Sequence, residues 1–132
     1  ADPVCPRLSG LAAAAARAAG ARVVEGGTYL AMEGPQFSTR AESELYRAWG
    51  CDVIGMTNMP EAKLAREAEL PYASVGMVTD YDCWRADTGA VEVTHVLEVL
   101  QANAALARET VRQLAAALPP ERPPSPIDTV LD

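Results

Sequence analysis

The sequence predicts an α/β domain, because apolar segments of strand length alternate along it with longer segments of helical pattern. Glycine and proline stand at most of the boundaries, where they end one element and let the next begin. The 132 residues suit one domain, and 49% of them are hydrophobic, so that a sizeable core can be buried. The expected order is helix, two strands, helix, strand, helix, strand and helix.

The first elements follow from alanine, glycine and proline. Residues 6–19 predict a helix, because alanine has the highest helix propensity and Pro6 suits a first turn. Gly20 is a natural stop for that helix. Residues 21–25 and 28–32 predict two short strands joined by two glycines.

A capping signal marks the second helix. Thr39 and Glu42 have the spacing of a capping box, and the amphipathic segment after them predicts a helix that runs to Trp49. The apolar residues 52–56 that follow predict a buried strand.

The remaining chain alternates again and ends in prolines. Residues 60–69 predict a helix opened by its proline, residues 72–78 a strand, and residues 79–92 an irregular polar segment. Residues 93–118 predict a long helix, and residues 119–126, with five prolines in eight positions, a linker or tail. The apolar side chains of the long helix lie close to one face: Val96, Leu97, Leu100, Ala104, Val111 and Leu114.

Charge and composition exclude several classes of partner. The net charge of −7 argues against a nucleic-acid partner, and no apolar stretch approaches the roughly 20 residues that span a bilayer. Cys5, Cys51 and Cys83 form no CxxC pair, so we expect reduced thiols in a cytoplasmic protein without a zinc site. The chain starts at Ala1 rather than Met, which favours a piece of a longer polypeptide.

Ligands of open α/β sheets bind at the carboxyl ends of strands, and this chain has three such places. At the first, a Gly34-Pro35 turn presents Phe37 and Ser38 from a rigid base, where an aromatic ring can stack on a flat ligand. The alternative is a simple strand-to-helix connection.

The second place is a strand that ends at Met56 before a helix. Helix N-termini attract anions, so the Thr57 hydroxyl is a candidate phosphate ligand. Thr57 or Asn58 can equally cap the helix, and Met56 can belong to the core.

The third place carries Asp80 and Asp82, two carboxylates that follow an apolar strand. A carboxyl shielded from water has a raised pKa, and can protonate a purine nitrogen as a general acid. A solvated acidic turn is the alternative, and two acids alone are a poor cation site. His95, the single histidine, is not placed in the site.

Together these segments resemble one family, the methylthioadenosine phosphorylases of the trimeric purine nucleoside phosphorylase group. The likeness extends from the start of the chain to about Leu118, and several separated motifs occur in order. They are Glu33–Glu42, Trp49-Gly50, Asp52–Thr57, Pro60-Glu61 and Thr79–Trp84. The resemblance implies helices around a mixed sheet, and phosphorolysis of a purine nucleoside without a metal or organic cofactor, with inorganic phosphate as co-substrate.

The resemblance also implies roles for single residues. Phe37 is similar to the aromatic residue that lines the base or ribose pocket, and Ser38 to the residue that helps select 6-aminopurines. Met56 resembles the methionine that contacts ribose. Thr57 resembles a phosphate-contacting threonine, which favours the phosphate interpretation over the cap.

For the base and the 5′ group, the resemblance points to the later segments. Asp80 and Asp82, with Tyr81 between them, resemble the adenine-recognising set, and Asp80 is the candidate that protonates N7. The 6-oxopurine relatives tend to have Asn in place of Asp80, so the acid favours adenine. Val93, Val96 and Leu97 match positions near a 5′-methylthio pocket, where apolar side chains favour a thioether over a hydroxyl.

The family's glycine-rich phosphate loop, its Arg-His pair and its last helix have no counterpart in these residues. We therefore expect residues 1–118 to be the carboxyl-terminal part of one phosphorylase domain, and residues 119–132 a proline-rich linker or tail. The expected reaction converts 5′-methylthioadenosine to adenine and 5-methylthioribose 1-phosphate. The expected partners are an amino-terminal half and further copies in a homotrimer. The alternatives are another substrate (a 6-oxopurine nucleoside, methylthioinosine or a 5′-halogenated deoxyadenosine) or a non-catalytic nucleoside-binding fragment.

Overall fold

The structure is a computed structural model that describes residues 2–85 and 93–132. Its elements confirm the predicted α/β class, with helices around a small parallel sheet. In chain order they are α1 (Pro6–Ala18), β1 (Tyr29–Ala31), α2 (Arg40–Ala48), β2 (Val53–Gly55), α3 (Asn58–Glu67), α4 (Val93–Ala117) and the 3₁₀ helix η1 (Pro126–Thr129).

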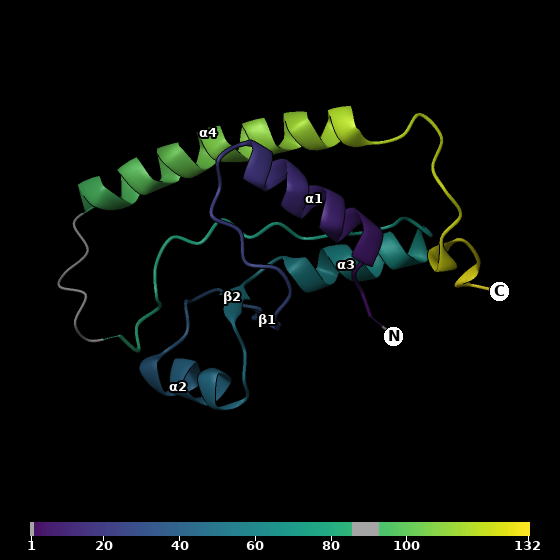
Figure 1. Cartoon of the computed structure of the whole chain (residues 1–132). Coiled ribbons are helices and arrows are strands. Elements are labelled where there is room, and N and C mark those ends of the chain that lie inside the picture. Colours follow the sequence, from purple (N-terminus) through teal and green to yellow (C-terminus); the bar gives the residue numbers. More distant parts are fainter. Residues whose placement is uncertain (1, 86–92) are drawn as a thin grey trace.

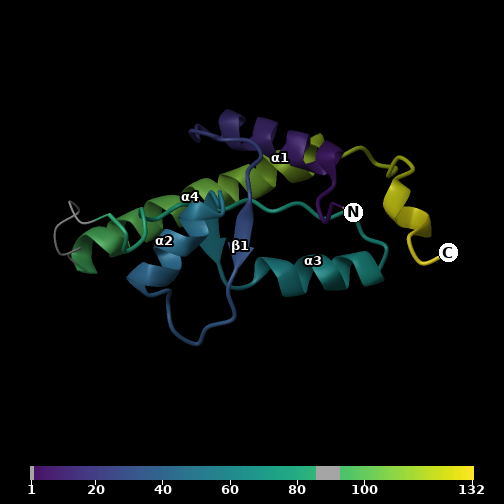
Figure 2. The same cartoon turned by 90° about the horizontal axis from the view of Figure 1, so that it is seen from below.

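The helices are arranged around the two strands. Figure 1 shows α4 and α1 together on one side of the molecule and α2 on the opposite side, with β1 and β2 between them. Figure 2, turned by 90°, shows α2 and α3 on either side of β1. The two strands thus lie at the centre of the molecule, and α3 contacts β1.

The two strands run parallel, and their register brings the ends of both to one edge. Tyr29 pairs with Val53, and Ala31 pairs with Gly55. The Met32 N–H extends the ladder by donating to the Gly55 carbonyl at 2.9 Å. Because parallel strands end at the same edge of a sheet, the segments after β1 and β2 leave side by side.

Two predicted strands are absent from the described part of the chain. Residues 21–25 and 72–78 form no strand, although Figure 1 shows the second segment running across the molecule. A strand needs a neighbour whose N–H and C=O groups complete its ladder. In the described residues only β1 and β2 supply each other with such a neighbour. Val24, Val75 and Val78 accordingly stay exposed.

The helices agree closely with their predicted ranges, with one shifted start. α2 begins after Thr39, whose capping box with Glu42 is present as predicted. α3 begins at Asn58 rather than at Pro60 and ends at Glu67. A proline is accepted at the third helical position because the first N–H groups of a helix have no partner within it.

The predicted apolar face of α4 is only partly covered. α1 packs against α4 through small side chains, and Ala12 and Ala16 of α1 are buried. On α4, Thr110 is buried, whereas Leu100 and Val111 of the apolar face are exposed. Periodicity predicted the helix correctly, and the apolar face is partly covered, with Leu114 half-buried.

The proline-rich tail contains an ordered turn. η1 begins with a capping box between Ser125 and Asp128, and Arg122 forms an ion pair with Asp128 at 2.6 Å. The division at residue 118 stays a prediction. Within the described ranges, every helix is too short or too polar to span a lipid bilayer.

Candidate functional site

The turn after β1 and the end of β2 are in direct contact. A Cβ placed on Gly34 would lie only 2.2 Å from the Met56 Cε atom, and Gly34 has a φ of +73°. The positive φ favours glycine at this position, whereas the Met56 methyl group, at the end of a flexible side chain, could move aside. Met56 therefore packs under the turn that leads to Phe37 and Ser38, as expected for residues of one site.

The acidic segment joins this place through a cluster of hydroxyl groups. The Ser43 hydroxyl donates to Asp82 Oδ2 at 2.5 Å, and its oxygen lies 2.9 Å from Ser38 Oγ. The Cys83 thiol lies 3.4 Å from Ser43 Oγ and 3.5 Å from the Ser38 carbonyl. The structure thus brings together Ser38 and Asp82, which the sequence assigned to the same base site.

Asp82 is held as an anion in a constrained backbone position. Its φ of +63° is uncommon for a side chain other than glycine. Burial disfavours its charge, but hydrogen bonds, first from the Ser43 hydroxyl and then from the Cys83 N–H, outweigh burial and lower the pKa of Asp82 below 3.8. Asp82 is therefore a negatively charged acceptor at neutral pH.

Asp80 lies beside Asp82 in the same turn. Its Oδ1 accepts the Asp82 N–H at 2.8 Å, and its Oδ2 accepts the Thr79 hydroxyl at 2.9 Å. Each carboxylate oxygen can accept a further hydrogen bond. Asp80 is exposed, so its carboxyl is accessible to a ligand.

One cation–π contact joins the acidic segment to α2, and one aromatic pair lies within that segment. The Arg47 guanidinium stacks 3.6 Å from the centre of the Trp84 ring, and Trp84 meets Tyr81 edge to face at 6.4 Å. Tyr81 itself is exposed, and Phe37 is 85% exposed. The Arg85 guanidinium lies 4.4 Å from the centre of the Tyr81 ring, so Phe37 is the more open of the two rings for stacking on a ligand.

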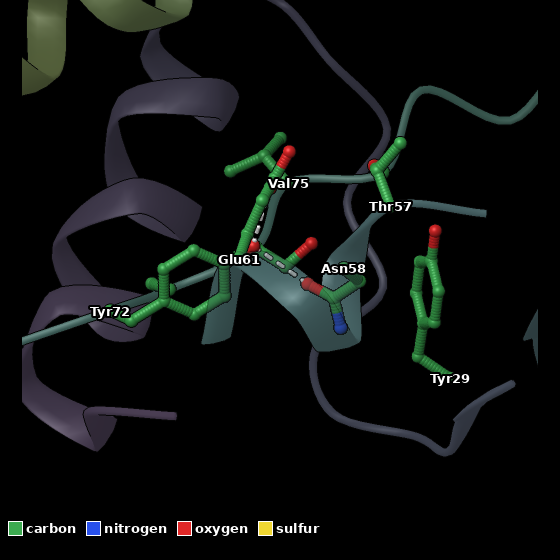
Figure 3. A pocket seen from close by; sticks show the side chains of 9 residues that line it. Tyr29, Thr57, Asn58, Glu61, Tyr72 and Val75 are labelled. Carbon is green, nitrogen blue, oxygen red and sulfur yellow. Dashed lines mark hydrogen bonds between the residues drawn. The ribbon is translucent and has the colours of Figure 1, made fainter. Parts of the chain in front are cut away.

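Thr57 lines a separate pocket of about 320 Å³ between β1, α3 and the segment after α3. It occupies the N-cap position of α3, yet its side chain makes no capping hydrogen bond. The Tyr29 hydroxyl lies against Gly55. The Tyr29 side chain lines the same pocket, with its hydroxyl end toward Thr57 (Figure 3). The free hydroxyl at a helix N-terminus agrees with an anion ligand better than with a cap.

The other end of this pocket is organised by Tyr72. Its hydroxyl lies 2.8 Å from Asn58 Oδ1 and 3.0 Å from Glu61 Oε2, so these two acceptors share its single hydrogen (Figure 3). Burial, followed by the hydrogen bond to Glu61 and the charge of Glu61, raises the pKa of Tyr72 above 10.0. Tyr72 is therefore a permanent donor that anchors the first turn of α3.

The residues expected near a 5′ group are only partly described. The side chains of Val93 and Val96 lie outside the described part, as does that of His95. Leu97 is 53% exposed on α4. Asn103 of the same helix donates to the Val78 carbonyl at 3.2 Å, so α4 is attached to the chain directly before the acidic segment.

The described residues form neither a metal-binding cluster nor a disulfide. Among residues 2–85 and 93–132, no group of three or more His, Cys, Asp or Glu side chains is placed to hold a metal ion. Cys5, Cys51 and Cys83 are free thiols.

A comparison with protein families decides the family. The profile of the phosphorylase superfamily matches residues 1–118. The chain belongs to the phosphorylase superfamily. Its segments after β1 and β2 and its acidic turn all lie within the matched range.

Individual members of the superfamily are closely similar. The S-methyl-5′-thioadenosine phosphorylase of Cereibacter sphaeroides is 61% identical over 134 aligned positions, which cover 100% of this chain and 46% of that protein. A crystal structure of a methylthioadenosine phosphorylase from an Antarctic soil metagenomic library superposes with a TM-score of 0.86 at 43% identity, covering 98% of this chain and 46% of the other.

A more distant structure shows the same fold. The methylthioadenosine phosphorylase of Schistosoma mansoni, in complex with adenine, superposes with a TM-score of 0.83 at 33% identity. That match covers 99% of this chain and 51% of the other. The present chain thus spans about half the length of the superfamily members that it resembles.

Sequence reasoning missed three residues of this phosphorylase-superfamily site. Ser43 is buried in α2, yet the capping box directly before it already explained the polar residues there. Tyr29 and Tyr72 were read as ordinary apolar strand positions. A small polar residue on the inner face of an amphipathic helix was the one signal for Ser43.

Proposed function

We propose that this chain forms the base and ribose end of the active site in an S-methyl-5′-thioadenosine phosphorylase. The observation that carries the proposal is the convergence of Ser38, Met56 and Asp82 at the carboxyl ends of β1 and β2. Closely similar chains in proteins of that name support the choice of substrate.

The proposed reaction needs phosphate as co-substrate and neither a metal nor an organic cofactor. A phosphate oxygen forms a bond to C1′ of the ribose, and the bond between C1′ and N9 of adenine breaks. The bonding electrons leave with the base, which takes up a proton at N7. The products are adenine and 5-methylthioribose 1-phosphate.

The roles of the acids follow from their surroundings. Asp82 is held charged by its hydroxyl partners, so it suits the role of an acceptor for the exocyclic amine of adenine. Asp80 is exposed and faces no hydroxyl cluster of that kind. From its match to the adenine-recognising set, we assign the proton for N7 to Asp80, where it neutralises the leaving base.

The phosphate end is proposed to lie at Thr57. Its uncapped hydroxyl and the positive end of the α3 dipole favour an anion there, beside the 320 Å³ pocket. Further phosphate ligands would come from the part of the relatives that this chain does not span. A homotrimer, in which a neighbouring copy completes the 5′ pocket, belongs to the same proposal.

The direct test is phosphate-dependent release of adenine from 5′-methylthioadenosine by the full-length polypeptide that contains this chain. We expect Asp80→Asn to lower kcat/KM by about 10²- to 10⁴-fold, the usual contribution of a general acid. Asp132→Asn, at the last residue of the chain, is the matched control and is expected to retain full activity.

Three results would contradict parts of the proposal. Adenine binding without turnover would favour a non-catalytic nucleoside-binding protein. Preference for a 6-oxopurine nucleoside would show that the substrate is not 5′-methylthioadenosine. An Asp80→Asn enzyme as active as the wild type would remove Asp80 from the chemistry.

A further inference from the structure

Ser43 is the buried centre of the hydroxyl cluster. It lies in the second turn of α2, and only 2% of its surface is exposed. Ser38, Asp82 and Cys83 all have polar atoms within hydrogen-bonding distance of its oxygen. Buried hydroxyl groups are almost always hydrogen-bonded, so the direction of each bond can be worked out.

The contact with Asp82 fixes that direction. An ionised carboxylate only accepts hydrogen bonds, so the single hydrogen of the Ser43 hydroxyl points to Asp82 Oδ2, at 2.5 Å. Ser43 must then accept in its 2.9 Å contact with Ser38. The competing bond from Ser38 to Asp82 is 3.5 Å long, beyond the usual range for two oxygens.

The hydrogen of Ser38 is therefore directed inward, and only lone pairs of its oxygen remain for a ligand. We propose that Ser43 is a specificity-determining residue, which by donating to Asp82 makes Ser38 an acceptor toward the purine and thereby favours a 6-amino over a 6-oxo base. This inference rests on the proposed function, in which Ser38 faces the base.

The 6-amino and 6-oxo purines differ in whether the group at C6 donates or accepts a hydrogen bond. A 6-amino group donates hydrogen bonds and meets the lone pairs of Ser38. A 6-oxo group only accepts, so it would face another acceptor and leave both oxygens without a hydrogen. Asp82, as a charged acceptor nearby, acts in the same direction.

Other groups around the cluster do not reverse this arrangement. Cys83 is a weak donor at 3.4–3.5 Å, and its thiol can point to the Ser38 carbonyl or to Ser43 without taking the hydrogen of Ser38. The Asp80 carboxylate meets the backbone N–H of Asp82 and the Thr79 hydroxyl. The Arg47 guanidinium lies over the Trp84 ring.

The test compares 5′-methylthioadenosine with 5′-methylthioinosine as substrates of the full-length enzyme. Ser43→Ala frees the Ser38 hydroxyl to rotate and donate, so we expect the ratio of the two kcat/KM values to fall at least about tenfold. Ser9→Ala replaces a helical serine in α1, remote from this cluster in the fold, and should leave the ratio unchanged. Equal loss for both substrates in Ser43→Ala would overturn the inference.

A double mutant tests whether Ser43 acts through Ser38. In a Ser38→Ala background, Ser43→Ala should no longer change the ratio, whereas an undiminished change would contradict the proposed route. If Ser43→Ala fails to fold, Ser43→Cys keeps the size of the side chain but donates weakly, and should lower the ratio in the same direction.

Binding of the free bases separates the two proposals. If the wild type cleaves neither nucleoside, the proposed function fails, but calorimetry with adenine and hypoxanthine still tests Ser43. The ratio of the two Kd values should then shift toward hypoxanthine in Ser43→Ala. No shift in that ratio would refute the role of Ser43, whatever the activity.

Discussion

At the level of single residues, the base end of the site depends on one small buried side chain. Ser43 orients Ser38 and Asp82 from inside, while the larger Phe37 and Tyr81 stay exposed. Ser38 and Asp82 could be predicted because both follow apolar segments at places where α/β proteins bind ligands. Ser43 could not, because its importance comes from contacts with residues 5 and 39 positions away.

The acid sensitivity of folding should reveal the bond between Ser43 and Asp82. The pKa of Asp82 is lowered in the folded state, so this group stabilises the fold above pH 3.8, and the contribution is lost as pH falls through the lowered pKa. We expect the difference in unfolding free energy between wild type and Ser43→Ala to be largest at neutral pH and to shrink in acid. Urea unfolding at several pH values measures it.

The difference in unfolding free energy between the wild type and Ser43→Ala separates the Ser43–Asp82 hydrogen bond from the titration of other acidic residues. The pKa of Glu109 of α4 is also lowered, to about 2, by its hydrogen bonds to Arg112 and Gln113, so Glu109 too loses its charge in acid. It is unchanged in Ser43→Ala, so its effect cancels in the difference. A difference that stays constant from neutral to acid pH would mean that Ser43 does not act on a charged Asp82.

At the level of elements, α2 and α3 each have a threonine at the N-cap position, Thr39 and Thr57, but only Thr39 makes a capping hydrogen bond. Thr39 accepts the Glu42 N–H and completes a capping box, and the Thr39 N–H and hydroxyl lower the pKa of Glu42. Thr57 leaves its hydroxyl free at the start of α3, which Asn58 and Tyr72 anchor instead. The first is a structural cap, and the second is open to a ligand.

The same substitution should therefore affect stability at Thr39 and phosphate binding at Thr57. Thr39→Ala is expected to lower the unfolding free energy by about 1 kcal/mol with an unchanged KM for phosphate, because it removes a cap. Thr57→Ala should raise the KM for phosphate about tenfold and change stability by less than about 0.5 kcal/mol. Steady-state kinetics with varied phosphate and thermal unfolding measure both.

Each substitution is the control for the other. A Thr57→Ala protein that loses stability but keeps its phosphate KM would show that this hydroxyl serves the fold only. An effect of Thr39→Ala on the phosphate KM would show that the two helix starts are coupled.

At the level of the whole molecule, the chain exposes more surface than its mass requires. A folded monomer of 14.0 kDa is expected to expose about 6,700 Å², whereas this chain exposes 9583 Å². The excess of roughly 3,000 Å² is of the size of a permanent interface. Exposed valines on residues 21–25 and 72–78 contribute to it, as does the uncovered face of α4.

This excess predicts how the isolated 132 residues behave in solution. We expect them to bind an apolar dye strongly and to unfold with a shallow denaturant dependence, because little apolar surface is buried. Adding the rest of the polypeptide should abolish dye binding and steepen the transition. A cooperative transition without dye binding by the isolated chain would contradict this expectation.

The sequence by itself predicted the helices α1 to α4, the apolar segments that contain β1 and β2, and the three polar segments proposed to bind the ligand. These follow from local signals: alanine propensity, a capping box, and glycine and proline at the boundaries. Only the tertiary structure decided which face of α4 is covered, which apolar segments find a strand partner, and how Ser43 directs Ser38. Those outcomes depend on contacts between residues far apart in the chain, and no local pattern contains them.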